Sequence, residues 1–173
     1  MSNAPEAWLR GPIDGVDPYR MPVAHALVQA REDLERVVPG LTPDEIWARP
    51  GGAASIGFHL RHIAGVLDRL FTYARGEMLS EDQLRALRAE GEPGQPAEEA
   101  TELLDATRAA IDLALERVRS TPGASLLEPR EVGQARLPST VLGLLYHAAE
   151  HVTRHTGQII TTARILRGQA GRM

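Results

Sequence analysis

The segment HAAEHVTRH, residues 147–155, contains three of the chain's six histidines at intervals of four residues. Four residues are about one turn of an α-helix, so His147, His151 and His155 are predicted to form one stripe along a helix. The stripe borders an apolar face that repeats at helical spacing: Leu145, Val152, Ile159 and Ala163. The segment therefore predicts an amphipathic helix whose imidazoles lie where its buried face meets solvent.

Three further long segments share this helical periodicity of apolar residues. In the first of them, one face carries the repeat: Val23, Leu27, Ala30, Leu34 and Val38. Capping residues and proline or glycine stops bound the four predicted helices, which we place near residues 22–38, 55–75, 97–119 and 139–167. Four long amphipathic helices predict an all-α fold, a four-helix bundle with short additional helices in its connections.

The short helices are predicted from their first residues. Thr42 is suited to cap one of them, because Pro43 and two acidic residues follow it. Ser80 begins a capping box, in which a glutamine follows three residues later, and so predicts a second. Residues 91–96 are rich in glycine and proline and are expected to break the chain before the third long helix.

Two longer connections are predicted to lack regular structure. Residues 1–21 are rich in glycine and proline and are expected to form an irregular lead-in over the surface. Residues 124–138 are expected to form an irregular crossover, after which Ser139 caps the last long helix. A chain of this length forms one ordinary domain more readily than two, so we interpret residues 1–173 as a single domain.

The composition limits the chemistry that the chain can perform. It contains no cysteine, which excludes disulfides, thiolate ligands and a thiol nucleophile of its own. All 19 basic residues are arginine, which excludes a Schiff-base lysine. The net charge is −4 and the basic residues are scattered, so we expect no nucleic-acid partner. No apolar run could span a bilayer and no secretory signal is present, so we expect no membrane partner and a cytoplasmic location.

A second helix supplies two more histidines, in the segment SIGFHLRHIA of residues 55–64. His59 falls within the apolar face of that helix and His62 on its edge, whereas His25 lies apart from the others. A bundle can bring this helix against the histidines of residues 147–155. Neutral imidazole is a common ligand of Zn, Ni, Fe and Cu, so convergence of three rings would form a metal site with open positions. Hydrogen-bonded packing within the core also explains such histidines.

These segments resemble a known family. SIGFHLRHIA (residues 55–64), followed late in the chain by EHVTRHTGQ (residues 150–158), resembles the DinB/YfiT-like superfamily over nearly the whole chain. The resemblance implies a four-helix bundle that holds a divalent metal, expected to be Zn or Ni, through His62, His151 and His155. His59 and His147 are additional to that triad, and either could act as an acid or base or support a ligand. Gln158 and Glu150 match motif positions with a supporting role.

The resemblance also implies a class of reaction. Relatives include transferases and isomerases that use a low-molecular-weight thiol such as bacillithiol, mycothiol or glutathione. A metal-dependent thiol S-transferase acting on a small molecule is therefore our first hypothesis. A metal-dependent hydrolase, with His59 or His147 moving protons, is the second. A non-catalytic metal- or ligand-binding stress protein is the third, and a homodimer stays open under all three.

Overall fold

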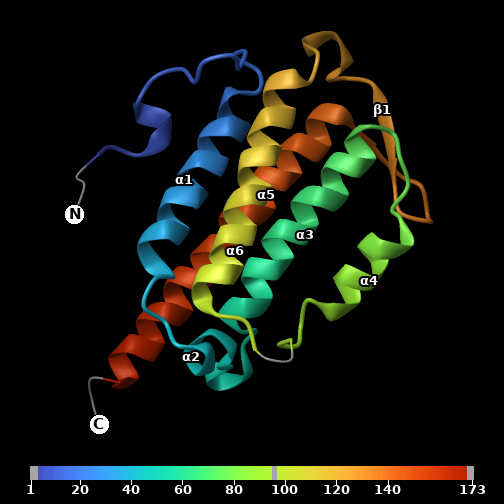
Figure 1. Cartoon of the computed structure of the whole chain (residues 1–173). Helices are drawn as coiled ribbons and strands as arrows, with labels where there is room; N and C mark the ends of the chain where they lie inside the picture. Colours follow the sequence, from blue (N-terminus) through green and yellow to red (C-terminus); the bar gives the residue numbers. More distant parts are fainter. Residues whose placement is uncertain (1–3, 95–96, 171–173) are drawn as a thin grey trace.

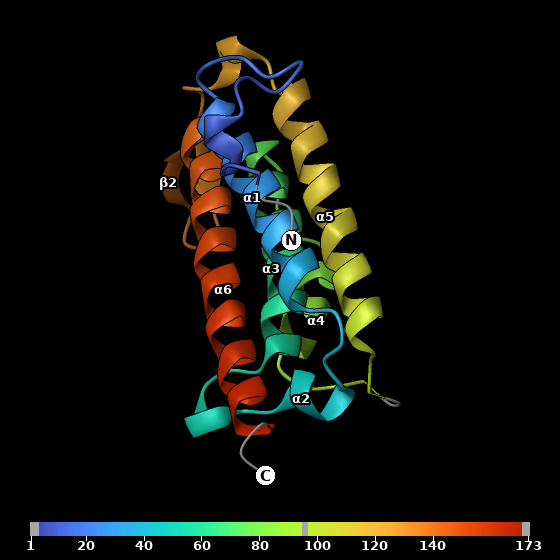
Figure 2. The same ribbon diagram turned by 90° about the vertical axis from the view of Figure 1, so that its left-hand side faces the viewer.

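Four long helices dominate the structure, a computed structural model that describes residues 4–94 and 97–170 (Figure 1). They are α1 (Met21–Val37), α3 (Ile56–Ala74), α5 (Ala100–Ser120) and α6 (Val141–Ala170). Helix α6 packs against α1 and α3, and α5 packs against the same two helices from the other side (Figure 2). The predicted all-α fold, a four-helix bundle, is confirmed.

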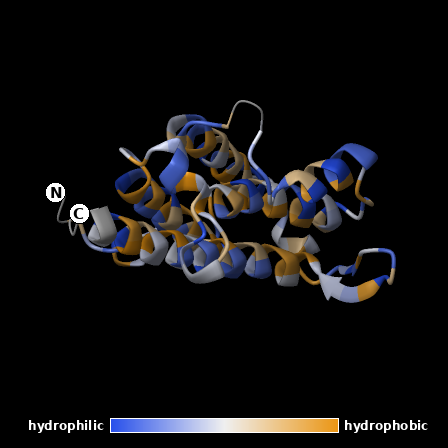
Figure 3. Ribbon diagram, turned by 90° about the horizontal axis from the view of Figure 1, so that it is seen from below, coloured by the Kyte–Doolittle hydropathy of each residue, from blue (hydrophilic) through white to orange (hydrophobic). Residues whose placement is uncertain are grey.

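The core between these helices is aliphatic. Hydrophobic and hydrophilic residues alternate along each helix (Figure 3), as expected for helices with one buried face. The largest fully buried side chains include residues from all four: Leu27, Leu34, Ile56, Leu60, Ile63, Leu67, Ile111, Val118, Leu145 and Ile159. None of the described helices is long and apolar enough to cross a membrane.

Both predicted short helices are present, as α2 (Pro43–Trp47) and α4 (Glu81–Ala89). Each begins with a complete capping box. Thr42 Oγ1 accepts a hydrogen bond from the Glu45 amide at 3.2 Å, and the Glu45 carboxylate accepts one from the Thr42 amide at 2.8 Å. Ser80 and Gln83 repeat this exchange at the start of α4. Helix α4 packs mainly on α3 and buries none of its own residues.

The lead-in is more ordered than predicted from its glycines and prolines. It contains a 3₁₀ helix, η1 (Ala7–Leu9), although residues 1–3 of the predicted segment lie outside the described residues. Three interactions hold it against α1: Ala7 N donates to Gln29 Oε1 at 2.9 Å, Arg10 pairs with Glu32 at 2.8 Å, and His25 Nε2 donates to the Gly11 carbonyl at 2.9 Å. The isolated His25 thus anchors the lead-in.

The prediction of an irregular crossover is wrong in part. After a 3₁₀ helix, η3 (Gly123–Ser125), the chain forms an antiparallel hairpin of β1 (Pro129–Val132) and β2 (Leu137–Thr140). Its turn is closed by a hydrogen bond of 3.1 Å from the Arg136 amide to the Gly133 carbonyl, and both residues have positive φ. Strands of four residues that each contain a proline are too short to show a clear alternating pattern.

Three predicted helix ends also shift. Ser139 does not cap α6, because it is extended in β2 opposite Arg130, and Thr140 Oγ1 instead accepts from the Gly143 amide at 3.0 Å. Helix α5 begins at Ala100 instead of residue 97, where the Glu99 amide donates to the Glu102 carboxylate at 3.1 Å. Helix α6 continues to Ala170, beyond the predicted residue 167. Residues 95–96 of the predicted break lie outside the described residues.

Candidate metal centre

The histidines of the two predicted segments face one another across one helix interface. His59 and His62 lie in the first turns of α3, which begins at the cap formed by Ser55. His151 and His155 lie near the middle of α6, which packs along α3. The early turns of α3 are thus placed beside the middle of α6, which is the adjacency that the predicted site requires.

Three ring nitrogens meet at this interface. His151 Nε2 lies 2.9 Å from His62 Nε2 and 3.0 Å from His155 Nε2. The ligand atoms of the three residues all lie within 4.8 Å of one another, and the group could hold a metal ion. Two nitrogens bound to one ion at about 2.0–2.1 Å are roughly 2.8–3.4 Å apart when they subtend a right or a tetrahedral angle. The two separations measured from His151 therefore fit a shared ion.

A buried carboxylate orients one of the three rings. Glu90, which follows α4 and is only 5% exposed, accepts a hydrogen bond from His62 Nδ1 at 2.7 Å and one from Arg69 at 2.6 Å. Burial acts to raise the pKa of Glu90, but the hydrogen bonds from His62 and Arg69 outweigh it and leave that pKa below its ordinary value. An ionised Glu90 holds the proton of His62 on Nδ1 and leaves Nε2 as a lone pair.

Close approach of Glu90 depends on a glycine in α3. A Cβ atom at Gly65 would overlap Glu90 Oε1 and would lie 2.6 Å from the Arg69 guanidinium. Glycine in a helix interior is unfavourable by about 1 kcal/mol relative to alanine. The contact explains why α3 has a glycine three residues after His62.

The tautomers of the other two rings follow from their neighbours. His155 Nδ1 lies 2.8 Å from His59 Nδ1, so one of these atoms carries a proton and donates it to the other. If His155 is the donor, its Nε2 is a lone pair. A proton on His151 Nε2 could be donated to only one of its two neighbours, His62 Nε2 and His155 Nε2. The lone pair of the other neighbour would then face His151 without a donor. All three Nε2 lone pairs are used when they bind one cation, which places the proton of His151 on Nδ1, a buried atom without a hydrogen-bond partner among the described residues.

Burial keeps these rings uncharged. The pKa of His59, His151 and His155 is lowered to about 4 in each case, first by burial and then by the neighbouring histidines. Neutral imidazole is the form that binds a metal. His151 and His155 are therefore in their metal-binding form at neutral pH.

A comparison with protein families agrees with this geometry. A family model described as the DinB superfamily matches residues 26–159, which include both histidine segments. The chain belongs to the DinB superfamily. A search of curated proteins gave no match to the chain.

The two histidines that DinB-type triads do not require differ in their surroundings. His59 is 5% exposed and touches the triad through His155. The His147 side chain is 47% exposed, and its Nδ1 lies 3.1 Å from the Glu150 carboxylate, which also binds Arg154 at 2.5 Å. The ring of His147 lies 5.3 Å from that of His151. Glu150 therefore contacts His147 at the surface rather than a triad ring.

A hollow of about 450 Å³ lies beside the triad of this DinB protein. It separates the 3₁₀ helix η2 (Pro50–Gly52) and the two alanines after it from the second half of α6. His59 forms part of its wall, and Arg154 and Gln158 line it from α6. His59 is thus the side chain that connects this hollow to the triad.

The sequence argument missed Glu90 and Arg69. Glu90 is 28 residues from His62 in the chain and ends a helix with no buried residue, so no local pattern points to it. The usable signal was Gly65, because a glycine in a helix interior often marks a close approach. That signal gives the place of the approach but does not identify the approaching residue.

Proposed function

We propose that this DinB-superfamily protein is a metal-dependent enzyme that transfers a low-molecular-weight thiol to an electrophilic small molecule. His62, His151 and His155 would hold a divalent ion, expected to be Zn or Ni. The observation that carries the proposal is the meeting of three Nε2 atoms, with separations of 2.9 and 3.0 Å from His151. Three ligands leave positions for a substrate, as catalytic sites do and closed structural sites do not.

The need for an external thiol follows from the composition. The chain has no cysteine, so a sulfur nucleophile must come from a cosubstrate. A bound divalent ion lowers the pKa of a thiol that coordinates it and so supplies a nucleophile at neutral pH. The residues of the chain would position the ion, exclude competing water and bind the body of the thiol.

His59 is our candidate for proton transfer within this proposal. Its ring lies between the hollow of about 450 Å³ and His155, and its pKa is lowered to about 4 by burial. When His155 donates to its Nδ1, the ring carries its own proton on Nε2, so His59 would move protons as a relay, giving up the Nε2 proton to the hollow while Nδ1 takes the proton of His155. His147 is a weaker candidate because its side chain is half-exposed and its Nδ1 is bound to Glu150. Bacterial thiols and glutathione are all of a size that a hollow of this volume can enclose in part.

The test combines metal loading with a thiol assay. Chelator-treated protein is loaded with Zn or Ni and incubated with glutathione, bacillithiol or mycothiol and a chromogenic electrophile. We expect thioether formation above the uncatalysed rate, with loss of that activity in His151→Ala and retention in His25→Ala. His25 is a matched control because it binds Gly11 away from the triad.

Two outcomes would contradict thiol transfer. Ester or amide hydrolysis that needs the loaded ion but no thiol would assign the site to a hydrolase. Metal uptake without turnover of either kind would leave a metal-binding protein. Failure of metal uptake by the wild-type protein at neutral pH would contradict the metal centre itself.

A further inference from the structure

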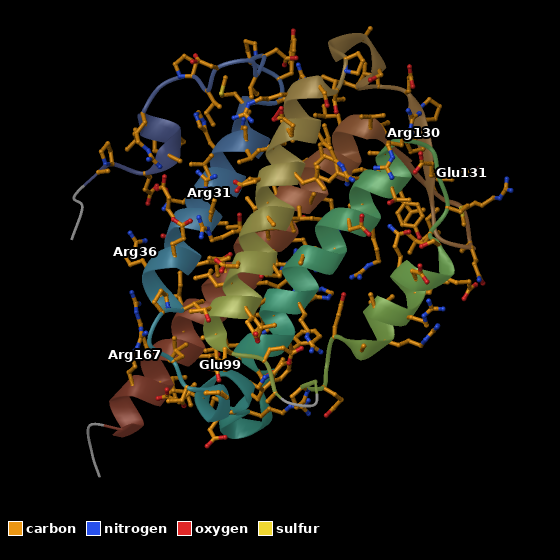
Figure 4. All side chains as sticks on the ribbon, in the orientation of Figure 1. Arg31, Arg36, Glu99, Arg130, Glu131 and Arg167 are labelled. Atoms are coloured by element: carbon orange, nitrogen blue, oxygen red, sulfur yellow. The ribbon has the colours of Figure 1, made fainter. Side chains whose placement is uncertain are left out.

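A second hollow lies at the end of the bundle remote from the histidines. Its volume is about 390 Å³, and it lies between the last turns of α3 and α5, the start of α6 and the strand β1. Three arginines surround it, and we call it the arginine hollow: Arg75, Arg117 and Arg130. Figure 4 labels Arg130, where β1 passes the end of α3. Arg75 lies thirteen positions after His62, at the end of α3, which is about 20 Å along the helix axis.

Two of the three arginines have structural partners. Arg75 binds the Glu77 carboxylate at 2.7 Å and donates to the Phe71 carbonyl at 3.1 Å. Arg130 binds the Glu128 carboxylate at 2.9 Å and donates to the Ala74 carbonyl at 2.7 Å. Both guanidiniums therefore cap the end of α3 and are partly neutralised.

Arg117 differs from both. Within the described residues, its side chain makes no hydrogen bond or ion pair, and its guanidinium lies 5.8 Å from the centre of the Phe71 ring. The pKa of Arg117 is lowered, first by burial and then by the charge of Arg75, although Asp68 and Glu77 oppose this. A half-buried guanidinium next to a like charge is unfavourable unless an anion joins it.

We propose that the arginine hollow binds a phosphate monoester with a small apolar body. The phosphate would lie against the guanidinium of Arg117, with Arg75 and Arg130 beside it, because guanidinium forks match phosphate oxygens. The apolar body would rest on Phe71, Ala74 and Val141, which line the same hollow. Its volume is within the range of small-molecule sites.

The pairing of the charges supports an anion at Arg117. Glu77 and Glu128 bind Arg75 and Arg130 directly, whereas Asp68 acts on Arg75 and Arg117 without an ion pair to either. Arg117 is therefore the guanidinium of the hollow that has no direct anionic partner among the described residues. This site is independent of the proposed thiol transfer, since none of its residues touches the histidines.

The test is a titration followed by nuclear magnetic resonance of the ¹⁵N-labelled full chain, at constant ionic strength set with NaCl. The probes are inorganic phosphate and phenyl phosphate. We expect saturable shifts at the side-chain Nε of Arg117, Arg75 and Arg130, with tighter binding of phenyl phosphate than of phosphate. Arg117→Gln should weaken phenyl phosphate binding at least about tenfold, the effect of losing a hydrogen bond to a charged group.

Arg164→Gln is the matched control. It removes the same charge from an exposed part of α6 and should leave the affinity for phenyl phosphate unchanged. Absence of saturable shifts in the wild-type protein would overturn the proposal, whether or not the variants fold. Equal affinity of Arg117→Gln and Arg164→Gln would also overturn it, because the binding would then reflect total charge. Equal affinity for phenyl phosphate and inorganic phosphate would contradict the proposed contact of the apolar body with Phe71, Ala74 and Val141.

Discussion

Two helix interfaces of the bundle differ in composition. The interface between α1 and α5 is mainly aliphatic, whereas the interface between α3 and α6 contains buried polar groups. In α1 and α5, aliphatic side chains such as Leu34 and Ile111 are fully buried, and the ion pairs between the two helices lie at the surface. The second interface buries His59 and brings in Glu90 and Arg69, polar groups that cost free energy unless each is paired. The comparison distinguishes residues that stabilise the fold from residues that would contribute to metal binding but not to stability.

The largest effect is expected from the polar interface. Removing one imidazole in His151→Ala should lower the affinity for Zn or Ni by more than about 100-fold, because loss of a ligand exceeds the 10–100-fold effect of losing a group that supports one. Isothermal titration calorimetry of chelator-free protein measures this. The free energy of unfolding of the apo protein should change little. The substitution removes packing contacts, but it also removes the unfavourable approach of His151 Nε2 to two other ring nitrogens. If His25→Ala loses as much affinity, the triad is not the binding site.

The aliphatic interface should show the reverse behaviour. Leu34→Ala removes a fully buried side chain from α1 and should lower the free energy of unfolding by about 2–5 kcal/mol. Urea denaturation of the apo protein measures the loss. Metal affinity of the remaining folded protein should stay close to that of the wild type. A strong loss of affinity in this variant would show that the two interfaces are not separable.

Glu90→Gln tests the group that orients His62. The amide can no longer act as the charged acceptor that holds the proton of His62 on Nδ1, so metal affinity should fall by about 10–100-fold. Gly65→Ala should act in the same direction, because the added Cβ atom overlaps Glu90 Oε1. Glu92→Gln is the matched control, as this carboxylate is exposed and, among the residues that the structure describes, pairs only with Arg49. Equal affinities for Glu90→Gln and Glu92→Gln would remove Glu90 from the site.

The last prediction concerns the dependence of stability on pH. The pKa of His59, His151 and His155 is about 4 in the folded protein, below the ordinary value of 6.5. The unfolded chain therefore binds more protons between these values, so stability is full above pH 6.5 and declines as the pH falls toward 4. The Tm of the apo protein should decline over this window, and less in a variant with all three replaced by alanine. Leu34→Ala should keep the wild-type dependence on pH.

The two interfaces also differ in how far the sequence predicts them. Apolar periodicity and caps located all four long helices and both short ones, because these signals are local. The spacing of His151 and His155 predicted their common face for the same reason, whereas His62 was selected from two candidates by resemblance. In the structure, His62 belongs to the group with His151 and His155 that could hold a metal ion, and His59 contacts His155 through Nδ1. Binding of a metal by His62 in place of His59 stays a prediction.

What the sequence could not predict depends on the folded arrangement. The partnership of Glu90 with His62 arises only when α4 folds back along α3. The hairpin of β1 and β2 was missed because two strands of four residues are stabilised by their pairing more than by their own pattern. That pairing in turn moved the cap of α6 from Ser139 to Thr140.

The attachment of α4 has a consequence for dynamics. This helix buries none of its residues and is held on α3 by hydrogen bonds such as those from Gln83 to Asp68 and Thr72, so we expect it to open locally before global unfolding. Glu90 directly follows it and would leave His62 whenever the helix detaches. The His62 imidazole would then exchange between its two tautomers. Amide hydrogen exchange along α4 would therefore report how often His62 loses its hydrogen bond to Glu90.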